Sequence, residues 1–157
     1  MGQVATIKGK LTAPATLTAI NLALTTAGLA TISAASGILN SSRLLLHYDS
    51  LPAMAVDVTG VEATDYHTSP AMGIAVALQV FIAVADDTTT DMMTTAEAYV
   101  DVVRAACETA LSASYPLARW TRSDPQGEPF NTQAGLPALL LTLDFEVRHH
   151  ADIAGTA

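Results

Sequence analysis

The sequence predicts an α+β fold: a mostly antiparallel β-sheet with two main helices packed on one face. Three stretches carry this prediction. Residues 72–85 place a branched apolar side chain at every second position, which is typical of a long strand with one face against a core. Residues 93–111 repeat apolar side chains at three- and four-residue steps, as an amphipathic helix does. Residues 139–148 again alternate, here between apolar and polar side chains, which predicts a closing strand.

The long strand has two different faces. One carries six branched residues that we expect in the core: Ile74, Val76, Leu78, Val80, Ile82 and Val84. The other carries mostly small residues: Gly73, Ala75, Ala77, Gln79, Phe81 and Ala83. A face of small side chains lets another surface approach the backbone closely. The run contains Gln79 and is too short for a membrane span.

The helix that follows has its own start signals. Thr94 and Glu97 fit a capping box, and Asp91 is a competing start one turn earlier. We expect the core-facing stripe to consist of Met93, Ala96, Val100, Val103, Cys107 and Leu111. Acidic residues before the helix suit the positive end of its dipole. The strand, the acidic turn and the helix therefore form one structural unit.

The remaining elements are predicted in chain order around this unit. Residues up to about 11 are expected to form an extended arm. Pro14 then opens a helix with Thr12 as a possible cap and Gly28 as its end, and Leu17, Ile20 and Leu24 form its apolar stripe. We expect short strands at 29–32 and 117–122, loops at 33–42 and 123–135, a second strand at 54–59 and a hairpin-like connection at 60–71. Residues from about 151 to 157 form a flexible tail. The whole chain, 1–157, is predicted to be a single domain.

Composition narrows the function. The 157 residues carry seven basic and fifteen acidic side chains, a net charge of −8. That balance argues against tight nucleic-acid binding, which needs clustered Lys or Arg, and suits a surface that DNA passes without sticking. The single cysteine, Cys107, lies on the apolar face of the predicted helix, so we expect it to be a small buried apolar side chain. The N-terminus lacks the long apolar stretch of a secretory signal, so we expect an intracellular product.

No constellation of residues predicts catalysis, a cofactor or a metal. The sequence has no glycine-rich phosphate loop, no nucleophile elbow and no zinc-binding helix. His149 and His150 are adjacent on a strand, so their side chains point to opposite faces. The paired carboxylates Asp86 and Asp87 lie at a strand end, where catalytic groups are common, but helix-start electrostatics explains them better. We expect no enzyme.

The best candidate contact surface follows the helix. Trp120 stands between Arg119 and Arg122, and the next segment carries Phe130. Trp, Arg and Phe are enriched at the centres of protein interfaces. A half-buried Trp on an edge strand is an equally good interpretation of this pattern. Asp86 and Asp87 are the other candidate interface residues. Asp144, Glu146 and Arg148 share one strand face, which predicts a solvated or subunit-facing ionic surface.

In its order of elements the chain resembles the tail terminator (tail-completion, minor tail) proteins of long-tailed bacteriophages. The residues that carry the resemblance are the N-terminal helix, the segment 50–56 entering a strand, the long strand 72–85, the acidic turn Asp86-Asp87 with the helix containing 99–106, and the closing strand 139–148. It spans residues 14–150, with no invariant motif. The Ala/Ser/Thr-rich stretch at 33–42 is less familiar for the family.

The resemblance implies a structural virion protein. Its expected partners are further copies of itself in a ring, usually a hexamer, the tail tube protein and a neck or head-completion protein. Genomic DNA would pass through the lumen as cargo, and no membrane is involved. Made in the bacterial cytoplasm, such a protein ends tube growth and joins the tail to the head. Another neck or head–tail connector protein, or a small α+β enzyme using Asp86, Asp87 and a histidine, are the alternatives.

Overall fold

A computed structural model describes residues 3–32, 37–39, 41–47, 51–64, 71–86 and 92–152. The helices are α1 (Gln3–Thr12), α2 (Pro14–Thr26), a 3-10 helix η1 (Ser42–His47) and α3 (Met92–Ser112). The strands are β1 (Ile38–Leu39), β2 (Ala53–Thr64), β3 (Ala71–Ala85), β4 (Ala118–Asn131) and β5 (Pro137–Asp152). In this part of the chain no helix is long and apolar enough to cross a membrane.

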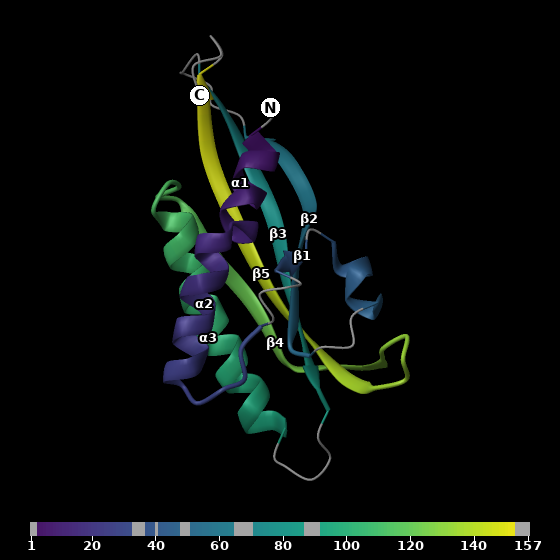
Figure 1. Cartoon of the computed structure of the whole chain (residues 1–157). Helices are drawn as coiled ribbons and strands as arrows, with labels where there is room; N and C mark the ends of the chain where they lie inside the picture. The colour runs from purple at the N-terminus through teal and green to yellow at the C-terminus, as the bar shows by residue number, and fades with distance from the viewer. Residues whose placement is uncertain are drawn as a thin grey trace.

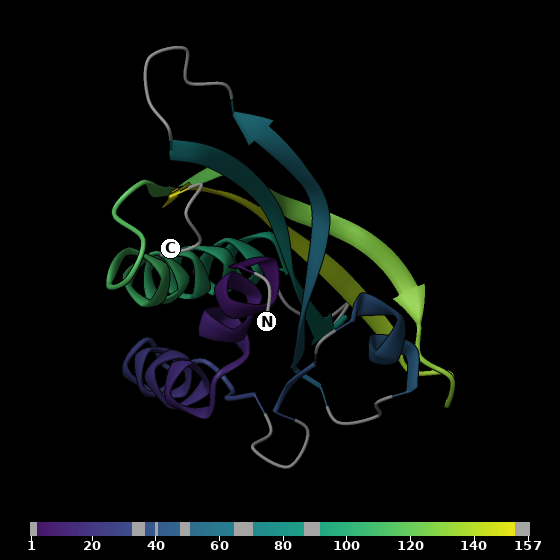
Figure 2. The same ribbon diagram turned by 90° about the horizontal axis from the view of Figure 1, so that it is seen from above.

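The predicted α+β class is confirmed. The five strands form one sheet in the order β1-β2-β3-β5-β4, with antiparallel pairs everywhere except between β1 and β2. The helices α1, α2 and α3 cover one face, and η1 lies on the opposite side of the sheet (Figure 1). Seen from above, the sheet curves around the helix layer (Figure 2). We call the face turned away from α1–α3 the open face.

Strand β3 is the centre of this sheet, as its alternation predicts. It pairs with β2 on one side and with β5 along its whole length on the other. The branched residues at 76, 78, 80, 82 and 84 are buried, with Ile74 partly buried at the margin of the same core. They meet Val100, Val103 and Leu111 of α3, which are also buried. Removing these apolar surfaces from water is the main contribution to stability.

Helix α3 begins at Met92, so the earlier of its two predicted starts is the correct one. Its buried stripe is the predicted one from Ala96 to Leu111, joined by Tyr99. Met93, expected in the stripe, is exposed, because it stands in the first turn beyond the edge of the core. Cys107 is fully buried, and burial with the nearby Glu108 charge raises the pKa of its thiol to about 12. The thiol therefore stays protonated and behaves as a small apolar side chain.

Helix α2 follows its prediction, with one difference at its start. Pro14 is the first helical residue, but the N-cap is Ala13, whose side chain makes no capping bond. Thr12 Oγ1 instead donates to the carbonyl of Lys8 in α1. The end of α2 is a Schellman arrangement, in which Gly28 has φ +76° and the Leu29 N–H donates to the Leu24 carbonyl at 2.9 Å.

The predicted extended arm is wrong. Residues 3–12 form α1, because Val4, Ile7 and Leu11 lie on one helical stripe, and the latter two are fully buried. The prediction of an extended arm does not take into account the burial of Leu11. The strand expected at 29–32 is also absent, since Ile32 is held by a different bond: its N–H donates to the side chain of Asn21 at 2.8 Å.

Strand β4 is the largest correction. The sequence predicts a short strand at 117–122 and a loop at 123–135, but β4 pairs with β5 as far as Asn131. Two register shifts, between Trp120 and Arg122 and between Asp124 and Glu128, absorb the irregular residues. Gly127 has φ +72° within the second shift. Prolines are tolerated here because an edge strand needs no hydrogen bonds on its outer side.

Two other boundaries also move. Strand β2 continues to Thr64, so only residues 65–70 remain of the predicted connection, and they lie outside the described residues. Strand β5 reaches Asp152, which shortens the predicted tail to 153–157, also outside the described residues. Of the loop expected at 33–42, Ile38 and Leu39 form β1.

Candidate functional site: the open face and edges of the sheet

Outside the part that η1 covers, the open face is a polar surface made from all four long strands. Among the residues whose side chains are described, strand pairing places nine charged ones on it: Asp57, Glu62, Arg119, Arg122, Asp124, Glu128, Asp144, Glu146 and Arg148. Six are carboxylates and three are arginines, so the face is acidic. Its centre is the small-residue side of β3, including Ala75 and Ala77. The charged groups therefore stand on either side of a low central strip.

Glu146 organises the arginines at one end of this face. It accepts a bond from Arg148 Nε at 2.8 Å and one from Arg119 Nη2 at 3.3 Å, so one carboxylate holds two guanidinium groups. The bond from Arg148, with the charges of both arginines, holds the pKa of Glu146 below its usual value. The sequence correctly predicts that Asp144, Glu146 and Arg148 form an ionic face. The cross-strand arginine, Arg119, is the additional partner.

The next row of the face is held by hydrogen bonds. Gln79 Nε2 donates to Asp144 Oδ1 at 2.9 Å, and these two residues face one another across β3 and β5. Arg122, Asp124 and Thr142 surround the same shallow pocket of about 160 Å³. Toward the far end, Ser42 donates from its N–H and its hydroxyl to the two carboxylate oxygens of Asp57. That contact ties the start of η1 to β2.

The structure separates the predicted Arg119–Trp120–Arg122 patch onto two faces. Trp120 pairs with the buried Phe145 and lies on the helix side, whereas Arg119 and Arg122 lie on the open face. The extra residue Thr121 is the reason, because it shifts the register and returns Arg122 to the side of Arg119. Strict alternation without the shift would separate Trp120 from Arg119 but would keep Arg122 on the same face as Trp120. The sequence pattern therefore indicates only part of the split.

Trp120 packs under the polar side of α3. The guanidinium of Arg104 lies 5.2 Å from its ring centroid, and Arg104 Nη1 also donates to Glu108 at 2.7 Å. The indole N–H donates to Ser123 Oγ at 2.7 Å. Even so, 40% of Trp120 remains exposed. The second of the two interpretations of the sequence, a half-buried Trp on an edge strand, describes this environment well.

Phe130 lies far from Trp120. Their partners on β5, Ala138 and Phe145, are seven residues apart, which corresponds to about 23 Å along the strand. Phe130 belongs to a second small core on the open face, under η1, whose buried members are Leu39, Leu45, Ala53, Ala55 and Ala83. Phe81 and Leu140 border it. This cluster explains why the predicted small-residue face of β3 carries one aromatic residue.

The acidic turn lies at the same end as Phe130. The Asp86 N–H donates to the Pro137 carbonyl at 3.1 Å, directly beyond the last β3–β5 pair. Asp86 is half-buried, and Asp87 lies outside the described residues. The structure thus places Asp86 toward the Phe130 end of the sheet and away from Arg119, Arg122 and Arg148.

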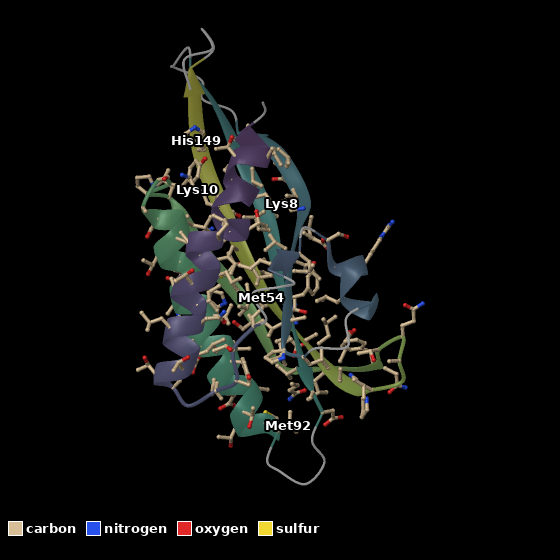
Figure 3. The ribbon with its side chains drawn as sticks, viewed as in Figure 1. Lys8, Lys10, Met54, Met92 and His149 are labelled. Carbon is tan, nitrogen blue, oxygen red and sulfur yellow. The ribbon has the colours of Figure 1, made fainter. Side chains whose placement is uncertain are left out.

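His149, the histidine with a described side chain, lies far from Asp86. His149 pairs with Ile74, twelve residues from Asp86 along β3, or about 40 Å. Figure 3 shows His149 and Met92, the first residue of α3, at opposite ends of the molecule. The His149 ring makes an edge-on contact with Tyr115, at 5.3 Å between centroids. Among the described residues no group of three or more His, Cys, Asp or Glu could hold a metal ion.

A groove of about 770 Å³ lies between α2 and α3. Alanines line most of it, and Asp101 is its one charged residue. This lining offers mainly apolar contact area.

No protein-family model matches this sequence, and no curated protein matches it either.

Proposed function

We propose that this chain is a structural protein of a long-tailed bacteriophage. In this proposal it forms a ring, hexameric by the family resemblance, at the head-proximal end of the tail tube. The ring ends tube growth, joins the tail to the neck, and leaves a channel for DNA. The order of elements from α2 to β5 is what the resemblance rests on.

The observation that carries the proposal is the open face of the sheet. It is broad, acidic and polar, and two of its three arginines are held by Glu146. A channel lining must expose such a surface without holding phosphate. Carboxylates repel a passing DNA backbone, and arginines engaged with carboxylates bind it weakly. We therefore place the open face toward the lumen.

Electron microscopy of phage particles made without this gene tests the proposal. We expect tails that fail to stop at their normal length and do not join heads. Tails of normal length that stay separate from heads would assign the chain to another neck or connector position. Normal tails on full heads, or virions whose mass spectrum lacks the chain, would refute a place in the tail.

The lumen assignment makes a separate prediction about Glu146. Glu146→Gln releases Arg119 and Arg148, so the full chain should acquire affinity for duplex DNA at low salt. With two freed arginines, that affinity should fall about tenfold between 50 and 200 mM salt. Filter binding or fluorescence anisotropy measures both quantities.

Glu128→Gln is the matched control. It removes the same charge from the same face, at a carboxylate for which the described part of the chain shows no arginine partner. It should leave DNA binding at the level of the unmodified protein. Equal binding by both variants would mean that net charge, and not the release of arginines, governs the face.

A further inference from the structure

The sheet has two free edges of matching length. Among the described residues, β1 pairs with Met54 and Ala55 alone, and η1 holds Asp57, so nothing in this part of the chain pairs with the outer side of residues 58–64 of β2. At the other end of the sheet, the outer side of β4 is unpaired in the described chain. Within β4 only residues 118–124 suit further pairing, since the rest contains Pro125, Gly127 and Pro129.

The directions of the strands make these edges compatible. Each step across β2-β3-β5-β4 is antiparallel, so β2 and β4 run in opposite directions. A second copy in the same orientation would place its β2 antiparallel to β4 of the first. Such a contact joins different surfaces on the two copies, and repeating it builds a ring where the rotation closes.

The side chains at the two edges are complementary as well. On the helix side each edge exposes one apolar residue, Trp120 on β4 and Val61 on β2, 40% and 49% exposed. On the open face, β4 offers Arg119 and Arg122, followed by Asp124 at the end of the segment, and β2 offers Glu62. One antiparallel register satisfies both faces, because Trp120 opposite Val61 places Arg119 opposite Glu62. A shift by one residue would reverse every side chain.

We propose that β4 of one copy pairs with β2 of the next through residues 118–123 and 58–63, with Arg119 opposite Glu62 and Trp120 opposite Val61. This contact rests on the proposed ring and names how its subunits join. After the shift at Thr121, Arg122 stands opposite Gly60. Because Gly60 has no side chain, the Arg122 side chain has space to lie beside Glu62. The cross-strand pairs bring opposite charges together on one face and cover apolar side chains on the other.

Disulfide trapping tests the contact on the full chain. Gly60→Cys and Arg122→Cys lie opposite one another in this register, and nothing lies within 4 Å of a Cβ built at Gly60. Opposed residues of an antiparallel pair have the Cα separation that a disulfide needs. The double variant should give a ladder of cross-linked oligomers under oxidation, whereas each single variant should remain uncross-linked. Cys107 is buried and does not interfere.

Charge reversal supplies an independent measurement. Arg119→Glu and Glu62→Arg should each weaken association about five-fold or more by light scattering, and the two changes in one chain should restore it. Arg148→Glu is the control, because it also loses the bond to Glu146 but lies inside the sheet. The sole tryptophan should become less accessible to quencher on association.

Three outcomes would overturn the contact. The first is a cross-linked dimer from Arg122→Cys alone, which would indicate that β4 of one copy pairs with β4 of another. The second is the absence of a ladder from the double variant at any protein concentration. The third is an equal loss of association from Arg119→Glu and Arg148→Glu. A ring seen on tail tubes despite these results would leave the proposed function standing with another subunit contact. A ladder from a chain that virions lack would support the contact and refute the function.

Discussion

Val80→Asp is expected to leave no stably folded protein. Val80 is fully buried at the centre of the sheet, paired with Val56 on β2 and Leu143 on β5, both also fully buried. An unpaired carboxylate there costs several kcal/mol, which is of the order of the total stability of a domain. Circular dichroism and the soluble yield after expression measure the loss.

Gln79→Asp is the matched control, one residue away on the opposite face. Gln79 is half-buried and loses one hydrogen bond to Asp144 in this variant, and the new carboxylate stands between Asp144 on β5 and Asp57 on β2. We expect a cost of about 1 kcal/mol and a folded protein. Equal loss of soluble protein from both variants would mean that the two faces of β3 are assigned wrongly.

Gly127→Ala should be the most costly single-methyl change in β4. Gly127 has φ +72°, and an added Cβ would lie 3.0 Å from Leu141 Cδ2 and 3.2 Å from the Leu140 carbonyl oxygen. The left-handed backbone costs about 1–2 kcal/mol for a residue with a Cβ, and crowding a packed site adds about 1–3 kcal/mol. Urea unfolding measures the lowered free energy of unfolding.

Gly135→Ala separates these two costs. Gly135 has φ +86°, but nothing lies within 4 Å of its added Cβ. This variant should show the backbone cost of about 1–2 kcal/mol alone. If Gly127→Ala is no more destabilising than Gly135→Ala, then Leu141 moves aside and β4 is not tightly seated on β5 at this point.

The elements with strong periodicity are the ones that sequence reasoning finds. In β3 and α3 the apolar spacing continues for many residues, so the core faces follow from counting. In α1 the stripe has only three members, and Leu11 closes it just before Pro14 ends the pattern. Burial of Ile7 and Leu11 stabilises this helix, and such tertiary contacts are not visible in the local propensity of a chain that contains Gly9.

Strand β4 and the candidate surface are also difficult to predict from the sequence, because their structure depends on contacts with other strands. Its alternation is broken by two register shifts, and the pairing partner, β5, supplies the order that its own residues lack. The sequence identifies Trp120, Arg119 and Arg122 as exposed contact residues, but only strand pairing shows which share a face. The ionic row at Asp144, Glu146 and Arg148 is visible in sequence because β5 has no such shift against β3.

The sheet also becomes narrower along its length. Pairing of β4 begins at Ala118, opposite Val147, and pairing of β2 ends at Thr64, opposite Gly73. Beyond these points the described chain pairs β3 with β5 alone, with Met72 opposite Ala151 and Ala71 opposite Asp152. A two-stranded ribbon is only marginally stable in water. The two strands can therefore separate and pair again at this tip while the rest of the sheet stays intact. The free energy of local opening is thus expected to be lower at the tip of β3 than in its centre.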